Sequence, residues 1–371
     1  MADLRSQYQK IKHEIDANIQ EVIDSSIFLK GGKVTEFQRD LEQYLGVRNV
    51  IPVANGTDAL TVSLMALGLQ ADDEVITSAF SFIATAEAIV LLGLKPVFAD
   101  VDADTFNISI NAVSQAITPR TKAIIPVHLY GQNSEMEELL SLAKRHNISV
   151  IEDACQSIGA VYSFSDGRKL QSGCMGDMGC MSFFPSKNLG CYGDGGAIFT
   201  NNDELAARVR SIANHGSIRQ YYHDRIGVNS RLDAIQAAIL QVKLKYLDTY
   251  ITARRQVADF YNNAFAGNEH IILPARLENS THVFNQFTIK LQNVNRENFR
   301  QKLLEQGIPT MIYYPVPLHL QKAFQNSGYT AGDFPVSEKL SETVLSLPIH
   351  SEMDNEQLEY IAEKILNLQF F

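Results

Sequence analysis

The chain has 371 residues, of which 45% are hydrophobic and 20% charged, and its formal net charge is −10. Because one hydrophobic core seldom organises so long a chain, we expect a globular protein with a large domain and a smaller one. The negative net charge gives no electrostatic reason to expect nucleic acid or an anionic membrane as a partner.

The N-terminal region is polar and favours helices. Residues Met1 to Arg5 carry no apolar signal segment, and no run of about eighteen apolar residues occurs along the chain. We therefore expect a cytoplasmic protein without a membrane partner. Residues 1–48 are expected to form two helices joined by a loop at Phe28–Gly32, packed on the main domain or on a partner subunit.

Between Val50 and Thr200, short β-branched runs alternate with segments of helical length. This alternation predicts an α/β domain with a mainly parallel, seven-stranded sheet, in which ligands bind at the carboxyl ends of the strands. The expected strands are Val50–Ala54, Glu74–Ser78, Pro96–Asp100, Ala123–Val127, Ser149–Asp153, Met178–Phe183 and Ala197–Thr200. The expected helices between the early strands are Asp58–Leu67, Ile83–Leu92, Ile110–Ile117 and Glu135–His146.

The second part of the chain begins with a polar segment, His215 to Arg231, which is typical of a functional loop, although a solvated surface loop fits the same residues. Leu232 to Ala264 has apolar residues at helical spacing and no Gly or Pro, which predicts one long helix that bridges two domains. We place the domain boundary between residues 231 and 232. A small α+β domain should follow, with strands Ile271–Pro274 and Val283–Leu291 and helices Arg296–Gln306, Ser337–Leu345 and Asn355–Leu366.

Four cysteines occur close together in the chain, at Cys155, Cys174, Cys180 and Cys191. Their separations of 19, 6 and 11 residues match no zinc-binding pattern, and a cytoplasmic setting argues against disulfides. We therefore expect buried or loop thiols and no metal.

Lys187 has the clearest chemical context in the chain. It lies between a Ser/Pro-rich turn, Ser182–Ser186, and a glycine-rich turn, Gly193–Gly196. A lysine fixed in this way can form a Schiff base with the aldehyde of pyridoxal 5′-phosphate (PLP). Asp153 ends an apolar strand, where an ionised carboxylate needs a cationic partner such as a protonated pyridine nitrogen. Gln156, three residues later, can reach the ring hydroxyl, so this region predicts a PLP site.

The phosphate and the ring of PLP have further candidate partners. Gly56 and Thr57 follow the first expected strand and open a helix, whose N-terminus can cradle a phosphate, although Thr57 also fits a simple N-cap. Ser182 could donate to the same phosphate. Phe82, which we prefer to Phe80, could stack on the pyridine ring, although both also fit a hydrophobic core.

Taken together, these motifs resemble a known family. The motifs Gly56–Leu60, Glu152–Gln156, Ser182–Gly190, Gly193–Gly196 and Asn229–Leu232 are similar, in the same order, to those of the DegT/DnrJ family of PLP-dependent nucleotide-sugar aminotransferases. The resemblance runs from about residue 3 to residue 368. It implies the type I aspartate aminotransferase fold, L-glutamate as amino donor, and a homodimer with active sites at the subunit interface.

The resemblance also implies roles for individual residues. Lys187 matches the Schiff-base lysine and Asp153 the partner of the pyridine nitrogen. The remaining matches are Gln156 at the ring hydroxyl, Phe82 as the stacking aromatic, Gly56, Thr57 and Ser182 at the phosphate, and Asn229 as a phosphate contact from the neighbouring subunit. Some relatives with histidine at the lysine position are sugar dehydratases, so Lys187 favours transamination.

Within the family, Cys191–Tyr192 and Val228–Asp233 are most similar to one branch. Its members aminate the C3 keto group of UDP-2-acetamido-2-deoxy-3-oxo-glucuronate, which implies a role in bacterial surface polysaccharides such as O-antigen. Arg231 is then a candidate ligand for the C6 carboxylate of the sugar, because a guanidinium matches a carboxylate. An arginine that braces the interface loop is an equally good interpretation.

The chain departs from this branch at one place. Where a His-Tyr-Pro run is expected near the substrate, the chain has Tyr313, Tyr314 and Pro315. Tyr313, Tyr314 and His319 are the candidate substrate contacts there. An aminotransferase that acts at C4 of a 4-keto-6-deoxy nucleotide sugar is the alternative; a PLP sugar dehydratase and a non-catalytic PLP-binding protein are weaker ones.

Overall fold

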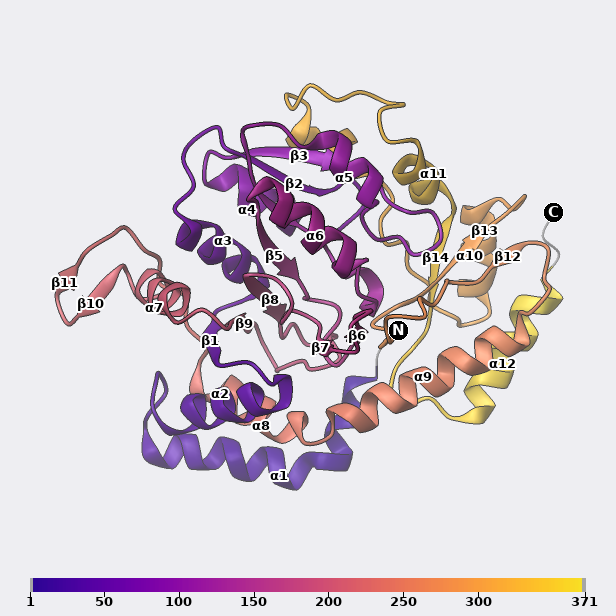
Figure 1. The fold of residues 1–371 in the computed structure, drawn as a ribbon. Helices are drawn as coiled ribbons and strands as arrows, with labels where there is room; N and C mark the ends of the chain where they lie inside the picture. The colour runs from indigo at the N-terminus through magenta and orange to yellow at the C-terminus, as the bar shows by residue number, and fades with distance from the viewer. Residues whose placement is uncertain (1–2, 369–371) are drawn as a thin grey trace.

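A seven-stranded sheet forms the centre of the molecule, and helices cover both of its faces (Figure 1). The structure is a computed structural model that describes residues 3–368. The strand order is β1-β9-β8-β5-β4-β2-β3, and neighbouring strands are parallel except where β9 lies between β1 and β8. The strands are β1 (Asn49–Val53), β2 (Glu74–Ser78), β3 (Lys95–Ala99), β4 (Thr121–Ile125), β5 (Ser149–Asp153), β8 (Met178–Ser182) and β9 (Gly196–Thr200). The predicted α/β fold with a mainly parallel sheet is confirmed.

Successive residues of each strand face opposite helical layers, as the two-residue period of a strand requires. On one face, Val75 and Ile151 belong to the core that α3, α4 and α7 cover. On the other face, Ile76 and Val150 belong to the core that α5 and α6 cover. These helices are α3 (Gly56–Leu67), α4 (Ala84–Leu91), α5 (Ile110–Ala116), α6 (Met136–His146) and α7 (Asp203–Ile212).

The two N-terminal helices, α1 (Leu4–Ser25) and α2 (Gly32–Leu45), pack against α8 (Ala234–Leu244), which comes much later in the chain (Figure 1). Ile15 of α1 and Ile239 of α8 share one buried apolar cluster. The helices occur where the sequence predicts them, and they pack on the main domain.

The predicted single helix from Leu232 to Ala264 is wrong, because the structure has two helices there, α8 and α9 (Leu247–Ala264). The last residues of α8 form tighter three-residue turns: Lys245 N–H donates to the Val242 carbonyl, and Tyr246 N–H to the Lys243 carbonyl. The turn lets α8 pack in the cores of the large domain while the C-terminal part of α9 packs in a different core. The predicted domain boundary at 231/232 would separate α8 from its core, so we propose a boundary within α9.

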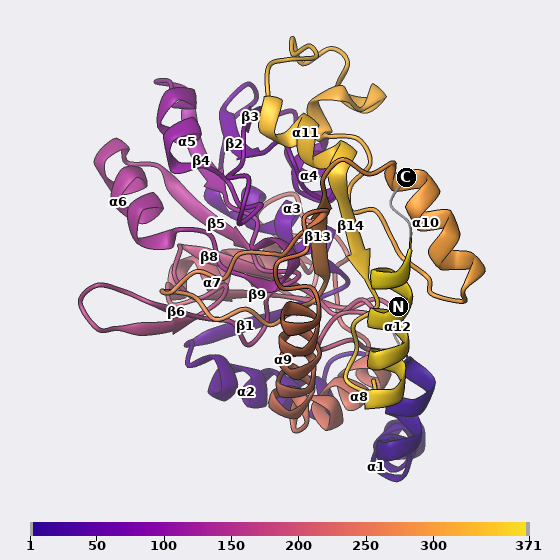
Figure 2. The same ribbon diagram turned by 90° about the vertical axis from the view of Figure 1, so that its right-hand side faces the viewer.

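The C-terminal part contains a three-stranded antiparallel sheet, β12 (Ile271–Ile272), β13 (Phe287–Leu291) and β14 (Val344–Leu347) (Figure 1). Figure 2 shows β13 and β14 side by side. Its helices are α10 (Arg296–Glu305), α11 (Pro335–Thr343) and α12 (Asn355–Asn367). Both predicted strands here are shorter than expected, and the predicted helix Ser337–Leu345 ends early. Val344 and Leu345 instead begin β14, which is buried on both faces and therefore shows no alternation in sequence.

Two hairpins lie in segments without a predicted strand. One pairs β6 (Val161–Ser163) with β7 (Lys169–Gln171), and the other pairs β10 (Ser217–Arg219) with β11 (Tyr222–His223). The second lies within the predicted polar loop 215–231 and extends away from the body of the molecule (Figure 1).

The four cysteines are free thiols. Burial raises the pKa of the Cys174, Cys180 and Cys191 thiols, to about 11 for Cys191, so these three are poor nucleophiles. Over residues 3–368, no helix has both the length and the apolar character that crossing a bilayer requires.

A buried carboxylate anchors the carboxyl end of β5. Glu152 accepts hydrogen bonds from three backbone N–H groups in residues 173–176, at 2.6–2.9 Å. Its fourth donor is His128, whose Nε2 lies 2.8 Å from Oε2 of Glu152. Because Nδ1 of His128 accepts from the backbone N–H of Ser134 at 3.1 Å, we assign the ring proton to Nε2. The imidazole is then neutral and donates to the carboxylate.

This anchor lies next to Asp153. Successive residues of a strand point to opposite faces, so the Glu152 carboxylate and the Asp153 carboxylate lie on opposite sides of β5. The backbone N–H of His128 also donates to the Asp153 carbonyl at 3.0 Å. The segment after β4, the end of β5 and the turn that enters β8 are therefore tied together at one point.

We predict that Glu152→Gln lowers the free energy of unfolding by about 2–4 kcal/mol, because the new amide nitrogen cannot accept the bonds that Glu152 accepts now. Urea unfolding followed by circular dichroism measures the change. Glu359→Gln, at an exposed position of α12, is the matched control. Equal unfolding midpoints for the two variants would show that the buried network contributes little.

Candidate active site

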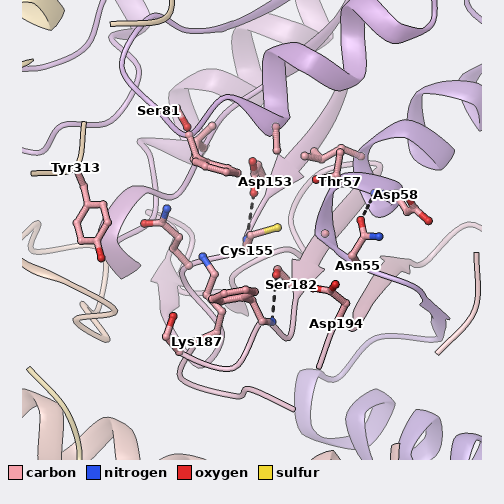
Figure 3. A pocket seen from close by; sticks show the side chains of 18 of the residues that line it. Asn55, Thr57, Asp58, Ser81, Asp153, Cys155, Ser182, Lys187, Asp194 and Tyr313 are labelled. Carbon is pink, nitrogen blue, oxygen red and sulfur yellow. Dashed lines mark hydrogen bonds between the residues drawn. The ribbon is translucent and has the colours of Figure 1, made fainter. Parts of the chain in front are cut away.

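A cavity of about 700 Å³ opens at the edge of the sheet where the parallel strands end (Figure 3). Its walls come from the turns after β1, β2, β4, β5 and β8, which all end at this edge, and from the C-terminal part. The structure brings together here the following residues predicted from the sequence: Gly56, Thr57, Phe82, Asp153, Gln156, Ser182, Lys187, Tyr313 and Tyr314.

One end of the cavity is the N-terminus of α3. Asn55 caps this helix, because its side-chain oxygen accepts from the backbone N–H of Asp58 at 2.8 Å. The N–H groups of Gly56 and Thr57 lie in the first turn, where a helix offers no internal acceptor, so an anion can accept their hydrogen bonds. A Cβ atom on Gly56 would lie 2.8 Å from Cβ of Ser182 and 3.0 Å from Sγ of Cys155, so only glycine allows the helix to approach β8 so closely.

Lys187 extends into the cavity from a well-anchored turn. Its backbone N–H donates to the Phe184 carbonyl at 2.9 Å, and the buried Lys243 ammonium donates to the Gly190 carbonyl at 2.6 Å. Burial lowers the pKa of Lys187, and the nearby Cys155 and Asp153 oppose that shift. A lowered pKa makes the neutral amine, the form that attacks an aldehyde, more accessible.

Asp153 is the last residue of β5, and Gln156 lies on the turn that follows it. The Asp153 carboxylate is buried, and its Oδ1 accepts from the backbone N–H of Cys155 at 3.2 Å (Figure 3). Oε1 of Gln156 accepts from the Tyr130 N–H at 2.8 Å, and Nε2 donates to the Tyr314 hydroxyl at 3.2 Å. The Gln156 amide is thus fixed in orientation before any ligand binds.

Aromatic side chains form another wall of the cavity. Phe82 lines the cavity and is 54% exposed, whereas Phe80 is 1% exposed and lies in the core. The Phe82 and Tyr314 rings are 6.1 Å apart and tilted by 40°. Burial raises the pKa of the Tyr314 hydroxyl, which keeps it protonated at neutral pH. Phe82 therefore has a free face on which a planar ring can stack.

Three predicted site residues do not line this cavity. His319 is buried away from it, with Nε2 3.0 Å from the Glu338 carboxylate and its ring against Phe334, so its position does not support the predicted substrate contact. Asn229 is exposed and Arg231 half-buried in the segment between the β10–β11 hairpin and α8. A residue that serves a partner's site would lie outside its own cavity, as Asn229 does.

Sequence reasoning missed several cavity residues. Some had a local signal, since Asn55 directly precedes the predicted phosphate site and Cys155 lies between Asp153 and Gln156. Gln286 comes from a distant part of the chain and had none. The missed polar and aromatic residues are Asn55, Asp58, Ser81, Cys155, Phe184, Ser186, Asp194 and Gln286.

The residues of the cavity fit PLP. An anion site at a helix N-terminus lies at one end, and a lysine amine, a buried carboxylate and an aromatic face lie around the centre. The cavity volume is in the range of small-molecule sites.

Three known proteins are similar to this chain over nearly their whole length. A protein of Geobacillus stearothermophilus named "pleiotropic regulatory protein" is 46% identical, over 98% of this chain and 97% of its own. The UDP-2-acetamido-2-deoxy-3-oxo-D-glucuronate aminotransferase of Pseudomonas aeruginosa is 44% identical, over 98% and 99%. The UDP-N-acetyl-3-dehydro-alpha-D-glucosamine 3-aminotransferase of Acidithiobacillus ferrooxidans is 43% identical, over 98% and 96%.

Solved structures share the fold closely. DesV of S. venezuelae, solved with a ketimine intermediate, superposes with a TM-score of 0.94 at 37% identity, over 98% of this chain and 96% of that one. The ntda protein of Bacillus subtilis, solved with the cofactor PMP, gives a TM-score of 0.89 at 35% identity, over 96% and 81%. The model of the DegT/DnrJ/EryC1/StrS aminotransferase family matches residues 9–366. The chain therefore belongs to this family and is a PLP-dependent sugar aminotransferase.

Proposed function

We propose that this aminotransferase transfers the amino group of L-glutamate to the C3 keto group of UDP-2-acetamido-2-deoxy-3-oxo-glucuronate, for a bacterial surface polysaccharide such as O-antigen. The observation that carries the proposal is the 44% identity to the Pseudomonas enzyme named for this substrate. The Acidithiobacillus relative is also named for amination at C3, of a sugar that is not named as an acid. The names thus favour C3 over C4 and leave the C6 carboxylate as the feature to test.

The residues of the cavity have proposed roles in this reaction. Bound PLP supplies an electron sink for the electrons of the substrate C–H bond. Lys187 would hold the cofactor covalently and, once displaced by the amino donor, would carry the proton at its Nζ. Asp153 would keep the pyridine nitrogen protonated, and Gln156 would face the ring hydroxyl.

The other cavity residues would bind and orient. Gly56, Thr57 and Ser182 would hold the phosphate at the N-terminus of α3. Phe82 would stack on the ring and exclude water from one of its faces. Tyr313 and Tyr314 would contact the sugar, since they line the cavity from the C-terminal part of the chain.

A homodimer with shared sites is part of the proposal. The β10–β11 hairpin and the turn after it expose large apolar side chains: Ile218 is 61% exposed, Tyr221 84% and Ile226 87%. The loop between α1 and α2 adds Ile27 and Phe28, which are also exposed. Apolar surface of this extent is typical of an interaction site. A second copy that covers it would bring Asn229 and Arg231 toward the partner's cavity.

We predict that the purified protein aminates the 3-oxo uronate with glutamate and releases 2-oxoglutarate, as measured by coupled assay and by mass spectrometry of the sugar. UDP-3-oxo-GlcNAc and a 4-keto-6-deoxy nucleotide sugar are offered in parallel. Lys187→Ala should lower turnover by at least about a thousandfold, because the acid/base group and the covalent anchor are both lost. Lys169→Ala, an exposed lysine of β7, is the control and should keep full activity.

Amination of the 4-keto sugar alone would keep the aminotransferase and replace the substrate. No amination of any sugar, with PLP bound, would contradict the proposal and favour a regulatory role like that in the name of the Geobacillus relative.

Arg231→Gln should raise KM for the uronate about tenfold, because an amide cannot form the charged pair with a carboxylate. The KM for UDP-3-oxo-GlcNAc, which lacks the carboxylate, should stay unchanged. Steady-state kinetics with both sugars measure the difference. A loss of the same size for both sugars would mean that Arg231 braces the interface and does not read the carboxylate.

A purified heterodimer of a Lys187→Ala chain and an Asn229→Asp chain should have about half the wild-type activity. If Asn229 serves the partner's cavity, one site of the heterodimer carries both defects and the other is intact. Each homodimer of the variants should be far less active, since Asp repels the phosphate. A heterodimer no more active than the Asn229→Asp homodimer would place Asn229 at its own chain's site.

A further inference from the structure

A threonine that no sequence motif singled out is bonded to the Asp153 carboxylate. Thr85 is the second residue of α4, and its hydroxyl donates to Oδ2 of Asp153 at 2.7 Å. Thr85 is 1% exposed, and its neighbour Ala84 lines the cavity. Thr85 does not itself line the cavity, so its hydroxyl contacts Asp153 from the protein interior.

The Asp153 carboxylate has one donor at each oxygen. Thr85 donates to Oδ2, and the backbone N–H of Cys155 donates to Oδ1 at 3.2 Å. A carboxylate can accept about four hydrogen bonds, so capacity remains for a donor in the cavity. Because Asp153 is only 6% exposed, its carboxylate depends on such donors in place of water.

The two donors also fix the direction in which the carboxylate points. They come from different elements, α4 and the turn after β5, and so act on the carboxylate from two sides. Thr85 is β-branched and lies in a helix, which limits its own side-chain rotation. The free lone pairs of Asp153 are thus held toward the cavity before a ligand arrives.

We infer that Thr85 is a positioning residue: it holds the Asp153 carboxylate oriented toward the place where the pyridine nitrogen of the cofactor binds. The inference rests on the role proposed for Asp153. Thr85 itself does not line the cavity, so its effect on cofactor affinity passes through Asp153. If the Thr85 hydroxyl donated to Asp153 only because a buried hydroxyl needs an acceptor, removing it would not change the affinity for PLP.

Thr85→Val keeps the shape of the side chain and removes the hydroxyl. It should raise the dissociation constant for PLP about tenfold, because a hydrogen bond to a charged group is lost. Thr85→Ser, which keeps the donor, should bind PLP nearly as the wild type does. Fluorescence titration of the cofactor-free protein with PLP gives the constants, and thermal unfolding checks that each variant is folded.

Thr77→Val is the matched control. Thr77 is also a fully buried threonine, but its hydroxyl donates to the Ile125 carbonyl within the sheet, at 2.9 Å. The same substitution there should leave the dissociation constant for PLP unchanged. A tenfold weaker binding by the Thr77 variant as well would trace the effect to the core and overturn the inference.

A double-mutant cycle with Asp153→Asn separates the two claims. If Thr85 acts through Asp153, adding Thr85→Val to Asp153→Asn should change PLP affinity no further. Additive losses would overturn the positioning role of Thr85. If Asp153→Asn alone leaves PLP affinity and the visible spectrum of the bound cofactor unchanged, the proposed role of Asp153 fails first, and with it the basis of the inference.

Discussion

Glu152 is the last residue but one of β5 and lies inside the protein, where water cannot solvate its charge, and it is stable there because four donors point at it. Those donors come from the segment after β4 and from the turn that enters β8. The carboxylate therefore sets the relative position of neighbouring strand ends. Asp153 is the next residue, so the hydrogen bonds of Glu152 on the opposite side of β5 fix the position from which Asp153 enters the cavity. The cavity can be polar and open because the Glu152 carboxylate that supports it is buried and has all its hydrogen bonds formed within the protein.

Local signals allowed much of this site to be predicted from the sequence. Lys187, Asp153 and Gly56 each lie in a short motif at the end of a strand, and parallel strands bring such ends to one edge. Phe82 was preferred to Phe80 without knowledge of the strand's orientation, and the structure places Phe82 in the cavity and Phe80 in the core. The assignment of roles to these residues stays a prediction.

What failed depends on contacts between distant segments. The break between α8 and α9 contains no Gly or Pro, and it lets α8 and the C-terminal part of α9 pack in different cores. β14 is buried on both faces, so its apolar run also fitted a helix. His319 was offered as a substitute for the histidine missing before Tyr314, but it contacts Glu338 and Phe334 and does not line the cavity. None of these packing partners is adjacent in the chain.

The position of β1 bears on how the protein is made. β1 is the first strand in the chain, and among the described residues it lies at an edge of the sheet, paired with β9. Its pairing with β9 cannot be complete until the ribosome has made Thr200, and contacts of such long range slow folding. Asn55 and Gly56 directly follow β1, so the anion-binding end of the cavity forms no earlier. β1, the first strand to be synthesised, therefore takes its place in the sheet only after β9, the last strand of that sheet, has been made.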